Sequence, residues 1–341
     1  MQQFGRALLL ALTLLVSLRG GPVPLDGELM AALNSVVSSY LQAPEAEMFE
    51  PVHDISPRKP FIFFHVPKAG GSSLRATIYK ATLRAKLAAF IPCHGGVPCA
   101  TYHFPRAVPL GRSVNKAVSI TGYKNVSAVS VYAGHFTTAE VSEHQVGTIP
   151  VQDFYCMTNF RDPADRLLSN IYYAAERRGK WKDIKHKQCI NDVDLSALKE
   201  MLDVAVETTY AFTFLSGYRV PIQREGIPAE EVIDVLNATL QHLRKCTPII
   251  LEEPMSFKLL SDRYPQLGEY QAFDPQQISN AGHATQSCDK PDAAHAVVLE
   301  ESVQLERILY TAVRAKIRGR INDVGLTPGV LRQQEKKRKK L

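Results

Sequence analysis

The sequence lacks a second long hydrophobic run, an internal repeat and a surplus of charge along its body. After the N-terminal segment, no apolar stretch approaches the length of about 20 residues that a membrane-spanning helix needs, so a multispanning membrane protein is excluded. No repeat period is visible, so a solenoid or a propeller is not indicated. The chain has 341 residues, which is enough for one large α/β domain or two small ones with a sizeable core.

The net charge of +6 comes almost entirely from the C-terminus. Residues 336–340 are all lysine or arginine, and without them 35 basic residues face 34 acidic ones. No helix or strand candidate carries a long basic stripe, so a nucleic-acid partner is not expected. Residues 326–341 are interpreted as a basic, disordered tail.

The N-terminus is typical of a targeting segment. Arg6 precedes an apolar run over residues 7–18, which ends at Arg19. Twelve helical residues span only about 18 Å, short of a bilayer core of about 30 Å. We therefore expect residues 1–21 to be a signal peptide, with a short signal anchor as the alternative. Either one places the protein in the secretory pathway, in the Golgi lumen, with membrane contact only if the segment is not cleaved.

Sequons and cysteines agree with a lumenal location. Asn125 and Asn237 begin glycosylation sequons. The cysteine count of six permits disulfides in an oxidising compartment. Cys93 and Cys99 flank a Gly-Gly turn and are expected to pair, whereas Cys156 lies in an apolar strand and is expected to be a buried free thiol.

The order of apolar and amphipathic stretches predicts an α/β fold with a mainly parallel central sheet. Residues 22–58 are rich in proline and are interpreted as a stem containing one helix, and residues 59–325 as the catalytic domain. Strands are expected at 61–66, 129–132, 154–160 and 247–251, and helices at 27–41, 72–87, 163–177, 228–244 and 299–320. Residues 88–128 show no strong pattern and are expected to be rich in loops.

The most informative segment is residues 64–74, which read FHVPKAGGSSL. A buried strand leads through Lys68, Gly70 and Gly71 directly into a helix whose first turn carries Ser72 and Ser73. Glycine allows close approach of the backbone, and the N–H groups of a first helical turn bind anions. The pattern predicts a site for a phosphate-like group, although an ordinary strand–turn–helix connection is the alternative. It is not a Walker A motif, because the lysine precedes the glycines.

A second motif lies in residues 159–173, which read NFRDPADRLLSNIYY. A strand is expected to end at Arg161 and a helix to begin near residue 163, with Ser169 on its second turn. Arginine with serine suits a dianionic phosphate, because guanidinium donates two hydrogen bonds in one plane. Arg166 is expected to pair with Asp162 or Asp165, and an ordinary helix cap with surface ion pairs is the alternative reading of the motif.

These two motifs together resemble the membrane-associated carbohydrate sulfotransferases, the group that includes heparan and uronyl 2-O-sulfotransferases and chondroitin sulfotransferases. The usual loop of that family is HVPKTGGTS, and this chain differs from it at Ala69 and Ser72. The resemblance covers roughly residues 60–320 and implies a three-layer, P-loop-like fold. It implies that the donor is 3′-phosphoadenosine 5′-phosphosulfate (PAPS), that the product is 3′-phosphoadenosine 5′-phosphate (PAP), and that no metal is needed. By resemblance, one set of residues holds the 5′-phosphosulfate and a second holds the 3′-phosphate: Lys68, Ala69, Gly70, Gly71, Ser72 and Ser73 for the first, Arg161 and Ser169 for the second.

The expected reaction is in-line transfer of a sulfuryl group to a hydroxyl, with Lys68 stabilising the leaving phosphate. His135 is the expected base, because it follows a strand-like run and a glycine, and because histidine suits proton transfer near neutral pH. Uronyl 2-O-sulfotransferases carry Tyr-His-Gly-His here, whereas Ala133 replaces the first histidine in this chain. A structural histidine is the alternative for His135, and Glu140 is the reserve base.

The sequence leaves two other functions open. Residues 249–253 resemble an apolar strand with an acidic pair that could hold Mg²⁺ in a P-loop kinase or NTPase. A catalytically silent relative that binds PAPS or a glycan is the other alternative. A zinc site at His94 and His103 fits no standard spacing. The expected acceptor is a glycan or another hydroxyl compound, and residues 88–128 and 179–195 are where its specificity is expected to lie.

Overall fold

The computed structural model describes residues 27–44, 46–97, 99, 129–142, 145–146, 149–150, 153–178, 189–209, 211–216, 229–267 and 290–323. Its centre is a sheet of five parallel strands in the spatial order β2-β3-β1-β6-β7. The strands of this sheet are β1 (Phe61–Phe64), β2 (Ala89–Phe90), β3 (Val131–Gly134), β6 (Tyr155–Phe160) and β7 (Cys246–Ile250). A separate antiparallel pair is formed by β4 (Gln145–Val146) and β5 (Ile149–Pro150).

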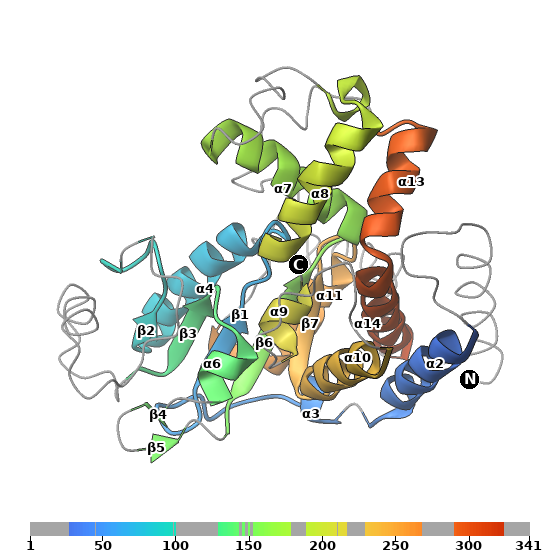
Figure 1. Cartoon of the computed structure of the whole chain (residues 1–341). Coiled ribbons are helices and arrows are strands. Elements are labelled where there is room, and N and C mark those ends of the chain that lie inside the picture. The colour runs from blue at the N-terminus through green and yellow to red at the C-terminus, as the bar shows by residue number, and fades with distance from the viewer. Residues whose placement is uncertain are drawn as a thin grey trace, which may run out of the picture.

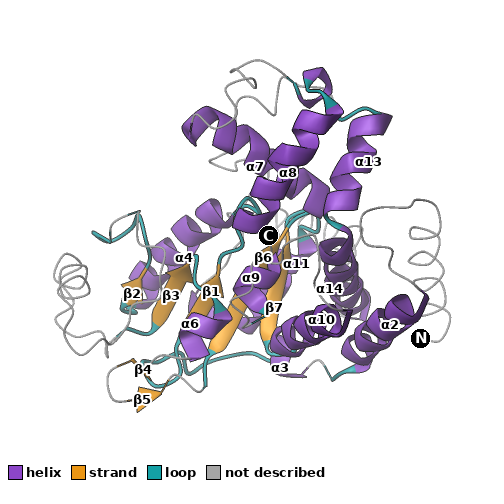
Figure 2. Cartoon of the chain, in the orientation of Figure 1, coloured by secondary structure: helices purple, strands orange, loops and turns teal. Residues whose placement is uncertain are grey.

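Helices surround the sheet, as Figures 1 and 2 show. They are α2 (Gly27–Gln42), α3 (Ala46–Phe49), α4 (Gly71–Ala85), α6 (Thr138–Ser142), α7 (Pro163–Arg178), α8 (Leu195–Thr209), α9 (Ala211–Leu215), α10 (Ala229–Leu243), α11 (Met255–Arg263), α13 (Ala293–Ser302) and α14 (Gln304–Asp323). Two short 3₁₀ turns, η2 (Ile190–Asp192) and η3 (Pro265–Leu267), complete the described elements.

The two faces of the sheet have separate apolar cores because successive strand side chains point in opposite directions. Ile62 and Phe64 of β1 pack with side chains of α2, α9, α10 and α14. Phe61 and Phe63 pack on the other face, with side chains of α4 and α11. Both faces are buried, which accounts for the continuous apolar run in β1. The expected three-layer α/β fold is thereby confirmed.

The strand order places a topological switch point between β1 and β6. After β1 the chain continues through α4 to β2, and after β6 it continues through α7 towards β7, on the opposite side. Ligands of open parallel sheets bind where neighbouring strands send their connections in opposite directions. Both anion motifs of the sequence lie at this point, because one follows β1 and the other follows β6. Figure 1 shows α7, α8 and α13 grouped beyond this edge.

Several boundaries differ from those expected. The strand predicted at 129–132 is β3, two residues later, and the helix predicted at 299–320 is two helices separated at Val303. Part of the segment interpreted as a stem is packed on the domain, since α2 contacts α10 and α14 and buries Leu33 and Val37. The targeting segment 1–21 and the tail 326–341 lie outside the described residues. In the described part of the chain, no helix has the length and apolarity needed to cross a membrane.

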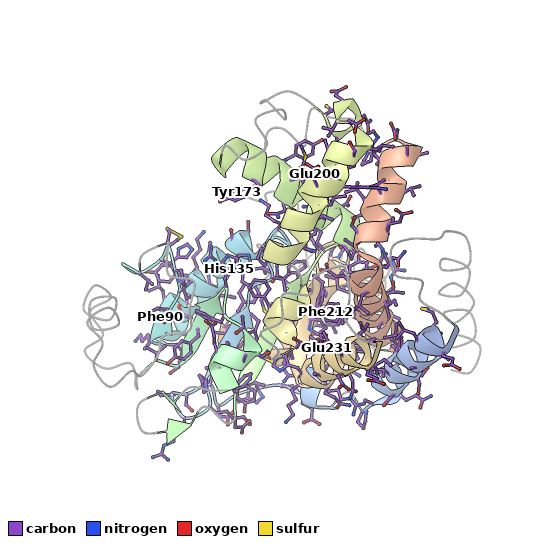
Figure 3. The ribbon with its side chains drawn as sticks, viewed as in Figure 1. Phe90, His135, Tyr173, Glu200, Phe212 and Glu231 are labelled. Carbon is purple, nitrogen blue, oxygen red and sulfur yellow. A yellow bond between two sulfur atoms is a disulfide. The ribbon has the colours of Figure 1, made fainter. Side chains whose placement is uncertain are left out.

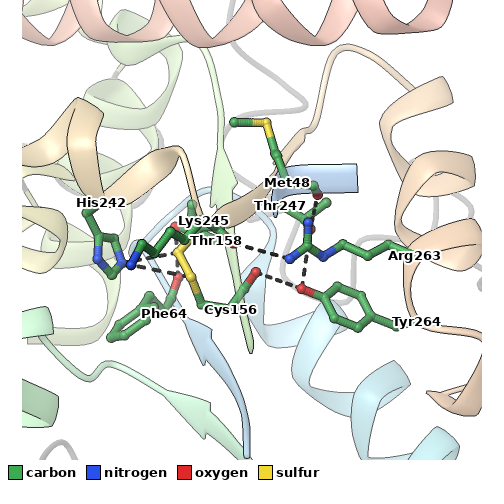
Figure 4. Close-up of a disulfide and its surroundings, with 10 residues drawn as sticks. Met48, Phe64, Cys156, Thr158, His242, Lys245, Thr247, Arg263 and Tyr264 are labelled. Carbon is green, nitrogen blue, oxygen red and sulfur yellow. Dashed lines mark hydrogen bonds between the residues drawn. A yellow bond between two sulfur atoms is a disulfide. The ribbon is translucent and has the colours of Figure 1, made fainter. Parts of the chain in front are cut away.

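Two disulfides have both cysteines within the described residues. Cys93 and Cys99 are bonded, as expected. The prediction of a free thiol at Cys156 is wrong, because Cys156 is bonded to Cys246, its partner in the register of β6 and β7. Adjacent parallel strands bring the Cα atoms to 4.6 Å, within the range that a disulfide spans. Figure 4 shows this bond with Tyr264, whose hydroxyl donates to the carbonyl of Cys156 at 2.9 Å.

Candidate functional site

Two glycines shape the loop between β1 and α4. Gly70 is the N-cap of α4 and has a φ of 77°, a left-handed conformation that favours glycine. A Cβ on Gly71 would lie 1.9 Å from Cδ2 of His65, so any side chain there would collide with the imidazole ring. No side chain caps α4, and its first turn contains no acidic residue. The first-turn N–H groups and the helix dipole therefore face a position suited to an anion.

A residue that the sequence analysis missed holds this loop in place. Asn159, near the end of β6, is 1% exposed. Its Oδ1 accepts from the N–H of Val66 at 2.9 Å, and its Nδ2 donates to the carbonyls of Val66 at 3.1 Å and Ala69 at 2.6 Å. A buried amide must satisfy its polar atoms. An asparagine inside an apolar strand was thus the signal that could have revealed this contact.

The structure brings the first anion motif and the start of the second together. Arg161 directly follows β6, and its Nη1 donates a long hydrogen bond of 3.5 Å to the carbonyl of Lys68. Lys68 has a φ of 63°, and its Nζ lies 4.0 Å from the ring centroid of Tyr173 on α7. Ser169 is half-buried on the same helix, one turn before Tyr173.

The prediction that Arg166 pairs with Asp162 or Asp165 is wrong. Nη2 of Arg166 lies 2.6 Å from Oε2 of Glu306, and both side chains are almost fully buried. Asp162 instead accepts from both terminal nitrogens of Arg307 on α14. These hydrogen bonds and the positive charge of Arg307 outweigh the effect of burial and hold the pKa of Asp162 below its usual value. The pairs Arg166–Glu306 and Asp162–Arg307 therefore attach the start of α7 to α14.

His135 lies just beyond the end of β3, at the same edge of the sheet. Its Nδ1 is 3.0 Å from the carbonyl oxygen of His65. Burial, with a smaller contribution from the charge of Arg75, lowers the pKa of His135 to about 4, although the hydrogen bond to His65 opposes this shift. The imidazole is therefore neutral near pH 7, and a carbonyl acceptor fixes the proton on Nδ1 and leaves the lone pair on Nε2. Figure 3 shows His135 below Tyr173 of α7.

A second imidazole lies beside His135, although Ala133 replaces the histidine that the uronyl 2-O-sulfotransferases carry. The ring of His65 stacks on that of His135, with centroids 3.9 Å apart and planes inclined by 25°. His65 is 3% exposed. Burial, followed by the nearby charges of His135, Arg75 and Lys68, holds its pKa well below the usual value. The ring of His65 therefore contacts both Gly71 of the anion loop and His135, the expected base.

Three acidic residues near this edge are engaged in other contacts. Glu140, the reserve base, accepts from the N–H of Thr137 at 3.0 Å at the start of α6. Glu252 accepts from the N–H of Asp162 and from the hydroxyl of Tyr310, both at 3.0 Å. Glu253 pairs with arginines 314 and 318 of α14 at 2.7 and 2.5 Å. The two glutamates after β7 therefore serve the attachment of α14.

Among the described residues, one cluster brings three side chains that can bind a metal within 4.8 Å of one another, namely Cys156, His242 and Cys246. Its two sulfurs are bonded to each other, so neither is a thiolate ligand. His94 stacks on Tyr79 and its neighbour Cys93 is in a disulfide, while His103 lies outside the described residues.

The expected specificity segments fall largely outside the described residues, which omit 100–128 and 179–188. Comparison of the chain with protein-family models and with curated proteins gives no match in either case.

Proposed function

We propose that this chain is a PAPS-dependent sulfotransferase that transfers a sulfuryl group to a hydroxyl, with a glycan as the acceptor. The observation that carries the proposal is the meeting of two anion motifs at the switch point between β1 and β6, with His135 at the same edge. Phosphate-like groups bind at such an edge, where an uncapped helix begins.

The donor's charged groups fit the residues present. Gly71 lets the imidazole of His65 pack directly against the loop, and the first turn of α4 supplies N–H donors for the 5′-phosphosulfate. Ala69 contributes its backbone, because its side chain is buried. Ser72 and Ser73 add hydroxyl donors. Arg161 and Ser169 lie on the side of β6 and α7, where they bind the 3′-phosphate.

In the proposed reaction His135 removes the proton of the acceptor hydroxyl at Nε2 as the hydroxyl oxygen attacks sulfur. The bond between sulfur and the bridging oxygen of the 5′-phosphate breaks. Lys68 and the N–H groups of α4 stabilise the charge that develops on that phosphate. Negative charge on a bound donor raises the pKa of His135 from about 4 towards the range useful for a base.

A Mg²⁺-dependent kinase or NTPase is disfavoured by the acidic pair after β7. Glu252 and Glu253 are held by Tyr310 and by two arginines of α14. Removing them to coordinate a metal would break these contacts. The lysine before the glycines also differs from the order in a Walker A loop.

The first test is calorimetric titration of the folded protein with PAP, alongside Lys68→Ala and Arg161→Ala. We expect wild type to bind and both variants to bind at least about tenfold more weakly, because each loses a charge-assisted contact to a phosphate. Lys59→Ala is the matched control, since Lys59 lies at the opposite end of β1 and pairs with Asp153.

A folded wild-type protein that fails to bind PAP but turns over ATP with Mg²⁺ would replace this proposal with the kinase alternative. If PAP binds, transfer of labelled sulfate from PAPS to a panel of glycans tests the reaction itself. Binding without transfer to any acceptor would identify the silent relative instead.

A further inference from the structure

The side chain of Lys68 has a direction that contacts with neighbouring elements define. Its backbone is in the left-handed region at a φ of 63°. Its carbonyl accepts from Arg161 at 3.5 Å, and the neighbouring Ala69 carbonyl accepts from Asn159. From this backbone the ammonium group reaches α7, where Nζ lies 4.0 Å from the centroid of the Tyr173 ring. That distance is well within the range of an attractive cation–π contact.

Tyr173 has no evident role in the apolar core. Its side chain is 40% exposed, one of the few large apolar side chains that are exposed among the described residues. It lies four residues after Ser169, so both project from one face of α7. This helix begins at Pro163, two residues after Arg161. The ring therefore lies on the helix that carries Ser169, one of the proposed 3′-phosphate contacts, while it touches the lysine of the 5′-phosphosulfate loop.

We propose that Tyr173 is a positioning residue that orders the ammonium group of Lys68 for an anion at the first turn of α4. A lysine side chain loses much rotamer freedom when it binds an anion, and a partner that already restricts it reduces that loss. The ring of Tyr173 lies against the ammonium group and restricts its position. The inference rests on the proposed function for the identity of the anion, which is the 5′-phosphosulfate.

A double-mutant cycle tests whether Tyr173 acts through Lys68. PAP dissociation constants are measured for wild type, Tyr173→Phe, Tyr173→Leu, Lys68→Ala and the Leu/Ala double variant. Tyr173→Leu should weaken binding by roughly 2- to 12-fold, the effect of ordering one additional flexible side chain. Tyr173→Phe keeps the ring and should stay within about twofold of wild type. In the Lys68→Ala background, Tyr173→Leu should have no further effect.

Three results would overturn the inference. Unchanged or tighter binding by Tyr173→Leu would show that the ring does not order a useful cation. A Tyr173→Phe variant as weak as Tyr173→Leu would assign the effect to the hydroxyl. An undiminished loss in the Lys68→Ala background would show that Tyr173 contacts the nucleotide directly. Thermal unfolding of each variant checks that an exposed substitution leaves the fold intact.

A ligand-independent measurement separates this inference from the proposed function. Lysines are reductively methylated with ¹³C, and the Lys68 methyl signal is expected to show an upfield ring-current shift that Tyr173→Leu removes and Tyr173→Phe retains. Lys59, whose Nζ lies 4.3 Å from the Tyr155 ring centroid, is an internal control that should not change. Absence of this shift in the folded protein overturns the contact.

If the shift is present but PAP does not bind, the donor assignment fails. The same cycle is then run with inorganic pyrophosphate as the anion. A loss of pyrophosphate affinity that depends on Lys68 supports the positioning role, and no such loss overturns it.

Discussion

At the carboxyl edge of the sheet, the loops that follow β1 and β6 (the first gap) and those that follow β6 and β7 (the second gap) are held by different contacts. Between β1 and β6, Asn159 and Arg161 bind backbone groups of residues 66–69. Between β6 and β7, Asp162 and the two glutamates after β7 bind arginines and a tyrosine of α14. Below the second gap a disulfide also joins the strands.

One edge of the sheet can therefore hold a ligand-binding loop in shape and also attach a helix to the domain. Contacts to backbone carbonyls hold the first loop in shape without neutralising the charge of Arg161. Ion pairs neutralise Asp162 and Glu253 of the second gap, and together with the hydrogen bond from Tyr310 to Glu252 they fix α14 to the sheet. The first gap is therefore suited to an anion, and the second stabilises the fold around it.

The largest effect on stability is expected from the disulfide below the second gap. Cys156 and Cys246 are 90 residues apart in the chain, whereas Cys93 and Cys99 are separated by 6. Chain entropy predicts that replacing the first pair by alanine lowers the free energy of unfolding by about 4.6 kcal/mol, and the second by about 2 kcal/mol. Urea unfolding of the two double variants measures both values. PAP affinity of the folded protein should be unchanged, and a larger loss from the shorter loop would contradict this account.

Acid should weaken the fold through a histidine in each region. The pKa of His135, near the first gap, and of His242, beside the disulfide, are both lowered to about 4, mainly by burial. An unfolded histidine takes up its proton near pH 6.5, so the unfolded state binds more protons between pH 6.5 and 4. Stability is therefore complete above pH 6.5 and falls as the pH decreases, by up to about 3 kcal/mol for each histidine.

Urea unfolding at pH 7.0 and pH 4.5 measures this dependence in wild type, His135→Gln and His242→Gln. Each variant should show a smaller loss at acid pH than wild type, and His53→Gln, at an exposed position, should behave like wild type. Only His135→Gln should abolish sulfuryl transfer. Equal acid sensitivity in all four proteins would mean that other groups dominate the pH dependence.

A smaller effect on stability is expected from the glycine that makes room for His65. Gly71→Ala places a Cβ 1.9 Å from the imidazole, and the required shift should destabilise the fold by about 1–3 kcal/mol. It should also weaken PAP binding by at least about tenfold, because a displacement that lengthens a phosphate contact loses a charge-assisted hydrogen bond. Thermal unfolding and calorimetry measure the two effects.

Gly319→Ala is the matched control for that variant. A Cβ on Gly319 meets no atom within 4 Å, and the residue lies exposed inside α14. Alanine should stabilise the helix there by about 0.5–1 kcal/mol and leave PAP binding unchanged. Equal behaviour of the two variants would argue against a tight contact between Gly71 and His65.

The sequence was sufficient for four of the five strands of the central sheet and for the strand–turn–helix connection between β1 and α4, because each depends on residues that are close in the chain. It missed β2, which lies in a segment expected to be rich in loops. A buried strand, a Lys–Gly–Gly turn and a helix can be recognised within eleven letters. It was insufficient for Arg166, whose partner Glu306 is 140 residues away, and for the stacking of His65 on His135, which are 70 residues apart. Such pairs depend on strand order and on the position of α14, which local periodicity does not determine. The disulfide of Cys156 was missed for the same reason, since its partner lies on the neighbouring strand.

The smallest effect is expected from the acidic pair of the second gap. Glu252→Gln keeps an oxygen that can accept from the N–H of Asp162 or the hydroxyl of Tyr310, so stability should fall by no more than about 1 kcal/mol. PAP affinity should change by less than about twofold, and added Mg²⁺ should not alter it, because the carboxylate contacts α14 rather than the ligand. Glu300→Gln, which removes a carboxylate from the outer side of Arg307, is the control for the loss of charge. A Mg²⁺-dependent loss of nucleotide binding in Glu252→Gln alone would show that the second gap also binds ligand, and the distinction between the two gaps would then fail.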